Sequence, residues 1–356
     1  MSTVYILAAV LLFGILIAVH EFGHFITAKA CGVSVHEFSV GMGPLLFRKQ
    51  GKETAYSLRL LPLGGYCAIE GEDENSDDPH SLTNQGYFRQ VLVFAAGAAM
   101  NFLLGLLIVI ALYSSAEYFL TPTIVELREG FPDAGENGVL AGDVLYELNG
   151  ERIYLFNDVE LVMSMGDFDD QGTLHAVLLR EGEKIRRTMH LTEYTNEDGS
   201  REYAYGFTYG GTVKASPRLK LKTAWYTSID FVRMTRMSLK MLLTGEAGIG
   251  DLSGPVGIVS TMEQMGSDAE TKRAGLENIL YFSALVSVNL AVMNLLPLPV
   301  LDGGKILFLT LNTVGYKLFR RRIPRRVENA LGTVCFIALI AMMFFVTYSD
   351  ITKLFG

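Results

Sequence analysis

The sequence predicts a polytopic α-helical membrane protein with four transmembrane helices, a membrane-associated β-hairpin region and an inserted extracytoplasmic α+β domain. Half of the 356 residues are hydrophobic and only 19% are charged, which is too apolar for an ordinary soluble protein. Four stretches are long and apolar enough to cross a bilayer. A polar segment between residues 122 and 211 separates the second stretch from the third. The net charge of -8 argues against a nucleic acid partner.

The four candidate spans have lengths near the roughly 20 helical residues that a bilayer core requires. They are residues 4–30, 91–113, 279–296 and 330–347. The third span runs into the string NLLPLPVLDGG, where Pro297 and Pro299 lack backbone donors and should stop or unwind the helix. Because unwound backbone at membrane depth is tolerated only against protein or water, a cavity is expected nearby.

The distribution of Lys and Arg predicts the orientation of the chain. Basic residues cluster in two short connections, one between the first and second spans and one between the third and fourth. Short basic loops stay on the cytoplasmic side of a membrane. Both termini and residues 114–278 should therefore lie outside, with His20 toward the cytoplasmic side of the bilayer.

Between the first two spans, VSVHEFSVGMGPLLFRK and ETAYSLRLLPLGGYCAIEGE alternate as strands do and contain Gly-Pro and Gly-Gly turn signals. They predict two small hairpins. An open strand edge in this region could accept an extended peptide as an added strand. Gly64, Gly65 and Tyr66 are the candidate substrate-binding residues on that edge.

The chain divides into four segments. Residues 1–117 hold the first two spans and the hairpins, and residues 118–213 form the outer domain, with several strands and a short helix at DVELVMSM. Residues 214–276 form an amphipathic linker, and residues 277–356 hold the last two spans. In the linker, Trp and basic residues beside an apolar face suit a helix on the lipid surface. Packing of that face against protein explains the pattern equally well.

The string AVHEFGHFI places three ionisable side chains inside the first span. His20 and His24 lie one helical turn apart on the same face, so both imidazoles can reach one cation. Glu21 points about 100° away, near enough to touch a water on that cation without being a ligand. Zinc fits, because it accepts imidazole and carboxylate ligands and keeps an open position. Satisfied core histidines are the alternative, but ionisable groups in a span are costly and usually functional.

A third ligand is needed, and Asp302 in LPVLDGG is the best candidate. It follows the interrupted third span at the expected depth of His20, although it could instead cap a helix. The polar span residues Asn101, Asn289 and Asn294 could hold helices together. Asn294 could equally hold a substrate backbone.

Six strings in this order resemble the site-2 protease family of intramembrane zinc metalloproteases, and within it the bacterial regulator-of-sigma-E protease type. The strings are HEFGH, GMGP, GGYCAIEGE, AAGAAMNF, LSGPVGI and NLLPLPVLDGG, and the resemblance covers nearly the whole chain. It implies one zinc ion per chain. It also implies the following roles: zinc ligands His20, His24 and Asp302, catalytic base Glu21, and residues beside the substrate Asn294, Pro297 and Pro299.

The outer string FPDAGENGVLAGDVLYELNGERI resembles a bacterial PDZ domain. In the family such domains screen substrates and favour those already trimmed on the outer side. This chain has room for one PDZ domain where many relatives have two. The resemblance implies cleavage of membrane proteins in or near their transmembrane segments, in the inner membrane of a bacterium, with anti-sigma factors or signal-peptide remnants as typical substrates.

A membrane metal transporter or a non-catalytic substrate adaptor is the rival interpretation. A transporter needs further ionisable residues along a path through the spans, and the sequence offers almost none. An adaptor would be expected to lack the general base, yet Glu21 is present.

Overall fold

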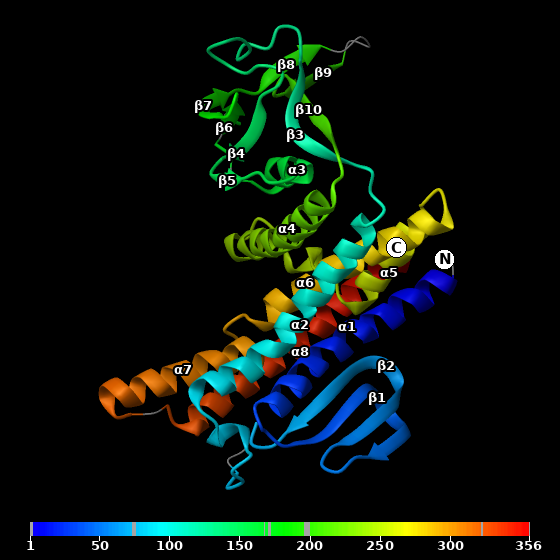
Figure 1. The fold of residues 1–356 in the computed structure, drawn as a ribbon, viewed down its shortest axis with the longest axis vertical. Helices are drawn as coiled ribbons and strands as arrows, with labels where there is room; N and C mark the ends of the chain where they lie inside the picture. Colours follow the sequence, from blue (N-terminus) through cyan, green and yellow to red (C-terminus); the bar gives the residue numbers. More distant parts are fainter. Residues whose placement is uncertain are drawn as a thin grey trace. The chain divides into compact units, whose positions relative to one another are not determined.

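The structure is a computed structural model that describes residues 3–72, 76–166, 168–169, 172–195, 200–321 and 323–355. It contains two compact units (Figure 1). The membrane unit comprises residues 1–112 and 244–356, and the sheet unit comprises residues 113–243. Within the described residues, four helices are long and apolar enough to cross a membrane, which confirms the predicted spans. They are α1 (Thr3–Ala30), α2 (Tyr87–Tyr113), α6 (Lys272–Asn294) and α8 (Arg325–Phe355).

The third span is interrupted where the prolines predict. Helix α6 ends at Asn294, and α7 (Asp302–Phe319) begins after a short irregular segment that contains both prolines. At its other end α6 begins at Lys272, earlier than the apolar pattern indicates. The Thr271 side chain caps it by accepting a hydrogen bond from the backbone N–H of Ala274 at 3.1 Å. The first turns are polar, so hydropathy alone misses them.

Small residues let α1 approach its neighbours closely. A Cβ on Gly23 would lie 2.4 Å from the carbonyl oxygen of Ala96 in α2, so only glycine fits there. A Cβ on Gly14 would lie 2.1 Å from the carbonyl oxygen of Pro62. Helix α1 is therefore in backbone contact with α2 on one side and with the β-hairpin on another.

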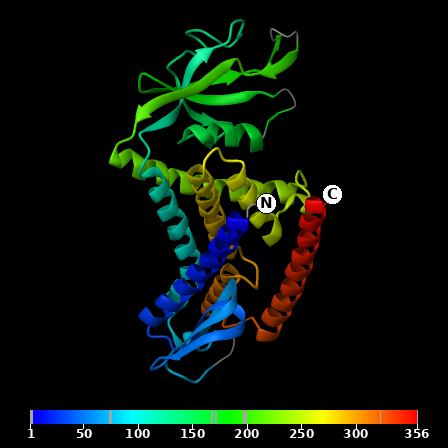
Figure 2. The same cartoon turned by 90° about the vertical axis from the view of Figure 1, so that its right-hand side faces the viewer.

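The prediction of two small hairpins was wrong. Strands β1 (Val35–Gln50) and β2 (Ala55–Ile69) form one antiparallel hairpin beside α1 (Figures 1 and 2). The glycines at 41, 43 and 64 have φ values of 83°, 81° and 98°, and they bend the strands instead of ending them. Residues 37–40 consequently pair with both ends of β2, namely with residues 65–68 and with residues 55–58. Among the described residues, the outer edge of 65–68 pairs with no other strand.

Helix α5 (Pro255–Ser267), in the membrane unit, is capped by a residue from α8. Asp350 Oδ2 accepts the backbone N–H of Gly254 at 3.0 Å and that of Gly257 at 2.8 Å. A Cβ on either glycine would lie within 2.9 Å of that carboxylate. The string LSGPVGI therefore supplies glycines where a buried anion meets the start of a helix.

The sheet unit is built on strands in the order β10-β3-β4-β6-β7, with β5 paired to β4; Figure 1 labels these strands. The elements are β3 (Tyr118–Leu127), β4 (Val144–Leu148), β5 (Glu151–Arg152), α3 (Phe156–Met165), β6 (Leu174–Arg180), β7 (Glu183–Met189) and β10 (Phe207–Lys214). A separate hairpin joins β8 (Thr192–Thr195) to β9 (Arg201–Ala204). The stretch TLHAVLLREGEKI folds as a hairpin because Glu181 and Gly182 both adopt positive φ. The short helix is confirmed as α3.

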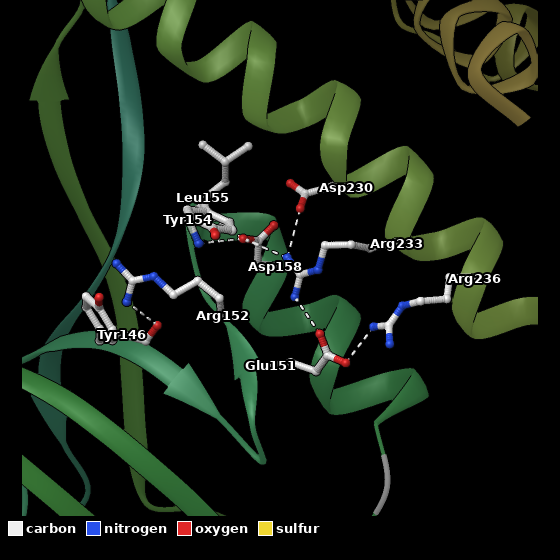
Figure 3. A network of polar contacts seen from close by, with 9 residues as sticks. All are labelled: Tyr146, Glu151, Arg152, Tyr154, Leu155, Asp158, Asp230, Arg233 and Arg236. Atoms are coloured by element: carbon white, nitrogen blue, oxygen red, sulfur yellow. Dashed lines mark hydrogen bonds and ion pairs between the residues drawn. The ribbon is translucent and has the colours of Figure 1, made fainter. Parts of the chain in front are cut away.

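The linker helix α4 (Pro217–Thr244) is held to α3 and β5 of the sheet unit by a buried ion cluster (Figure 3). Arg233 of α4 donates to Asp230 at 2.9 Å, and its guanidinium lies 3.3 Å from the Asp158 carboxylate. It also reaches Glu151 at 3.5 Å. Arg236 donates to the other oxygen of Glu151 at 2.5 Å. The polar face of α4 thus packs on protein, while its membrane-surface role stays a prediction.

Because of this cluster, we expect the stability of the sheet unit to depend on pH. Burial and the nearby Asp158 carboxylate raise the pKa of Asp230 to about 9. An unfolded Asp ionises near pH 4, so unfolding releases a proton between about pH 4 and 9, and stability falls as pH rises through that window. Asp230→Asn keeps hydrogen-bonding groups toward Asp158 and Arg233 but has no proton to release. It should stabilise the unit at neutral pH by about 1 kcal/mol or more.

Thermal unfolding of the full chain in detergent, followed by fluorescence between about pH 5 and 9, tests this expectation. Trp225 is the only tryptophan and lies on α4, so its emission reports this helix. Glu193→Gln, at an exposed carboxylate in the same unit, is the control. A pH slope in Asp230→Asn as steep as in the wild type would refute the role of Asp230.

Candidate metal centre

The three predicted ligands lie together in the membrane unit. His20 and His24 come from one face of α1, and Asp302 is the first residue of α7. The two Nε2 atoms are 3.2 Å apart, and each lies 3.3 Å from Asp302 Oδ2. Within the part of the chain that the structure describes, this is the single group of three or more His, Cys, Asp and Glu side chains that could share a metal ion.

The spacing of these atoms fits a zinc ion. A tetrahedral zinc with bonds of about 2.0–2.1 Å keeps its ligand atoms about 3.3 Å apart. The three measured distances agree with this value. Asp302 Oδ2 is also buried and accepts no hydrogen bond from any of the described residues, an arrangement that is costly unless a cation lies against it. Two imidazoles and one carboxylate form a donor set that zinc accepts while keeping a fourth position for water.

The second nitrogen of each imidazole contacts a group that can orient the ring. For Nε2 to offer its lone pair to an ion, Nδ1 must carry the proton. His24 Nδ1 donates it to the backbone oxygen of Val93 at 2.8 Å. His20 Nδ1 lies 3.4 Å from Nδ2 of Asn294, and exchanging the amide nitrogen and oxygen of Asn294 would place an acceptor at this position. Such outer contacts fix the ring orientation of metal-ligating histidines.

Gly97 of α2 is a site residue that the sequence reasoning did not single out. A Cβ on Gly97 would lie 2.3 Å from His24 Nε2 and 2.6 Å from His20 Cε1. Glycine is therefore required for both imidazoles to fit between α1 and α2. The small residues of AAGAAMNF were the available signal, but the sequence does not tell which of them faces the histidines.

We expect Gly97→Ala to weaken zinc binding by about tenfold or more, because the added methyl group displaces one or both rings. Zinc affinity of the purified protein, measured by competition with a chelator, checks this. Gly332→Ala is the matched control, since Gly332 also lies in a helix and a Cβ there meets nothing within 4 Å. Equal zinc affinity in both variants would refute the crowding argument.

The predicted substrate residues adjoin the centre to different degrees. A Cβ built on Gly65 would lie 3.5 Å from Cγ of Glu21, so the free edge of β2 passes directly beside the proposed base. The Tyr66 hydroxyl instead accepts a hydrogen bond from Arg59 of the same strand at 2.9 Å. The Tyr66 side chain therefore contacts the hairpin itself, and only the Tyr66 backbone lies on the edge. Pro299 lines a cavity of about 1060 Å³, at the position where the interrupted span predicts one.

Within the described part of the chain, the Asn101 side chain does not form the hydrogen bond between helices that the sequence suggests. The residue is 1% exposed, and its side-chain amide has no hydrogen-bond partner among the described residues. The link between α2 and α6 runs through its backbone, because Ser287 donates to the Asn101 carbonyl oxygen at 2.7 Å. Serine hydroxyls can reach a main-chain carbonyl of a neighbouring helix, so the amide is not needed for this contact.

Comparisons with known proteins agree with the chemistry of these residues. The sequence profile of peptidase family M50 matches residues 8–342. A protein from Clostridium perfringens that bears the name zinc metalloprotease is 35% identical, and the match covers 98% of each chain. Similarly named proteins are 32% identical in Clostridium acetobutylicum, over 99% of this chain and 98% of the relative, and in Fusobacterium nucleatum, over 98% and 99%.

Proposed function

The chain belongs to peptidase family M50 and is a zinc metalloprotease, and from this premise we propose that it cuts membrane proteins in or near their transmembrane segments. One observation carries the proposal. The three candidate ligand atoms lie 3.2–3.3 Å from one another, the separation expected of ligands around one zinc ion, and two of them belong to an apolar helix long enough to span a membrane. A site held on such a helix meets peptide bonds that soluble proteases do not reach.

In the proposed mechanism, His20, His24 and Asp302 hold one zinc ion per chain. When bound, zinc would polarise the scissile carbonyl and lower the pKa of water, so that a hydroxide nucleophile is available near neutral pH. Glu21 takes the proton from the attacking water and passes it to the leaving amine. Asn294 keeps the His20 ring in its orientation, and contact of Asn294 with the substrate remains part of the proposal.

The β2 edge is proposed to present the substrate. A transmembrane helix resists cleavage because its carbonyls are held in i to i-4 hydrogen bonds, so the substrate must be unwound first. Residues 64–66 can pair with the unwound backbone as an added strand. Gly65 has no side chain, so the paired backbone can approach Glu21 closely. Pro297 and Pro299 keep the segment between α6 and α7 non-helical.

We further propose that the protein lies in a bacterial cell membrane, with both termini and the sheet unit outside and the metal centre toward the cytoplasm. The positive-inside pattern of the short loops supports this orientation. The sheet unit is proposed to act as a single PDZ domain that favours substrates trimmed beforehand on the outer side. Anti-sigma factors and signal-peptide remnants are the proposed substrate types.

Cleavage of a model single-span protein by the detergent-purified chain tests the function. We expect a cut mapped by mass spectrometry within or beside the span, and its loss when a chelator removes zinc. Cuts confined to the soluble parts of the substrate would contradict the intramembrane assignment. Zinc binding without any cut, across several single-span substrates, would favour the adaptor or transporter interpretation.

A further inference from the structure

The string GGYCAIEGE continues past the β2 edge to Glu72, a residue that the proposed mechanism does not use. Glu72 Oε1 lies 2.7 Å from Nζ of Lys305, and the two side chains are only 19% and 30% exposed. Lys305 Nζ also lies 5.8 Å from the centre of the Phe94 ring, so part of its environment is apolar. Because the pair is partly removed from water, its attraction is screened less than that of a fully exposed pair.

Lys305 is rigidly linked to the candidate ligand Asp302. It lies on the first turn of α7, which begins at Asp302. This turn packs tightly on the preceding segment, since a Cβ on Gly303 would lie 2.2 Å from the Leu295 oxygen and one on Gly304 would lie 1.9 Å from the Leu298 oxygen. A movement of the Lys305 backbone would therefore move Asp302 with it.

Glu72 is linked to the end of β2 by a backbone hydrogen bond. Its backbone N–H donates to the carbonyl oxygen of Ile69, the last residue of β2, at 3.3 Å. Next to it, the backbone oxygen of Glu70 accepts from Leu82 at 2.8 Å, which secures the chain after the strand. The same strand carries Gly65, which faces Glu21. The ion pair thus joins the element that would hold the substrate to the element that supplies the third ligand.

Apolar contacts also join α7 to the end of β2. Ile306 and Leu309 of α7 pack against the buried cluster that contains Ile69 and Phe94. Apolar contacts hold two surfaces together but are non-directional. A hydrogen-bonded ion pair fixes two specific atoms at one distance. The Glu72–Lys305 pair can therefore set the register between β2 and α7 that the apolar contacts leave free.

We propose that Glu72 and Lys305 form a positioning pair that fixes the substrate-pairing edge of β2 relative to Asp302, so that one peptide bond of an added strand is presented to the metal centre. The inference rests on the proposed function for its catalytic consequence. Displacing reacting groups by about 1 Å can cost a factor of 100 in rate. Loosening the pair should therefore reduce turnover and let neighbouring bonds reach the centre.

The test uses the full chain with Glu72→Gln, Lys305→Met and the exchanged double variant Glu72→Lys with Lys305→Glu. Glu53→Gln is the control, because it removes a different ion pair of the same region, between Glu53 in the turn of the hairpin and Lys29 of α1 at 2.8 Å. We expect turnover to fall about tenfold in the single variants with KM changed by less than about twofold, and products cut at several adjacent bonds. The exchanged variant should restore one cleavage site.

Hydrogen exchange of the backbone amides of residues 64–70 provides a readout that does not depend on cleavage. It should quicken in both single variants, stay unchanged in Glu53→Gln and slow again in the exchanged variant. Unchanged exchange together with one unshifted cut would overturn the proposal. If even the wild type cuts no substrate, the proposed function fails, and the exchange rates still decide whether the pair holds the edge.

Discussion

Replacing Glu21 with Gln is expected to lower cleavage of a single-span substrate by a factor of at least about 10²–10⁴ while leaving zinc in place. The amide has nearly the size of the carboxylate but cannot take a proton from water. Glu21 is not one of the three residues whose ligand atoms converge. The loss should therefore be one of proton transfer and not of metal. Zinc stoichiometry and cleavage measured on the same detergent-purified sample separate these two effects.

Glu277→Gln is a suitable control, since Glu277 pairs with Arg273 on an exposed turn of α6. It should retain both zinc and activity. Cleavage retained by Glu21→Gln would remove Glu21 as the general base. Loss of zinc from that variant would instead place Glu21 among the ligands.

Replacing Asp302 with Asn is expected to weaken zinc binding on the order of 100-fold or more. The change removes the anionic oxygen that lies 3.3 Å from both imidazole nitrogens and leaves two neutral ligands. Activity should be lost with the metal, in contrast to Glu21→Gln, where activity is lost and the metal is kept. A chelator competition assay on purified protein measures the change.

Asp251→Asn, at a carboxylate in η2 (Ile249–Asp251), serves as the control for charge removal in the same unit. Unchanged zinc affinity in Asp302→Asn would show that Asp302 is not a zinc ligand. The interpretation of Asp302 as a helix cap would then gain weight, because it is the first residue of α7.

The spans and the candidate ligands could be predicted because their signals are local or strongly constrained by lipid. An apolar stretch of sufficient length has few alternatives to a membrane helix. His20 and His24 are one turn apart in any helix, so their convergence follows from helix geometry alone. The end of α6 follows from the missing donors of Pro297 and Pro299.

The remaining features depend on tertiary contacts that no local pattern specifies. The Gly-Pro and Gly-Gly strings indicate turns in most sequences, yet here glycines with positive φ bend two long strands. Gly97 is one of several small residues in α2, and only the packing of α1 shows which one meets the histidines. The Glu72–Lys305 pair joins residues far apart in the sequence, so neither partner predicts the other.

The discontinuity of the membrane unit has a consequence for biogenesis. Residues 113–243 form the sheet unit, and the two candidate ligands on α1 lie before it while Asp302 lies after it. Domains generally fold as units while the ribosome is still adding residues. The sheet unit can therefore fold while the metal centre still lacks its third ligand. The candidate metal centre of a nascent chain therefore stays incomplete until α7 has been synthesised.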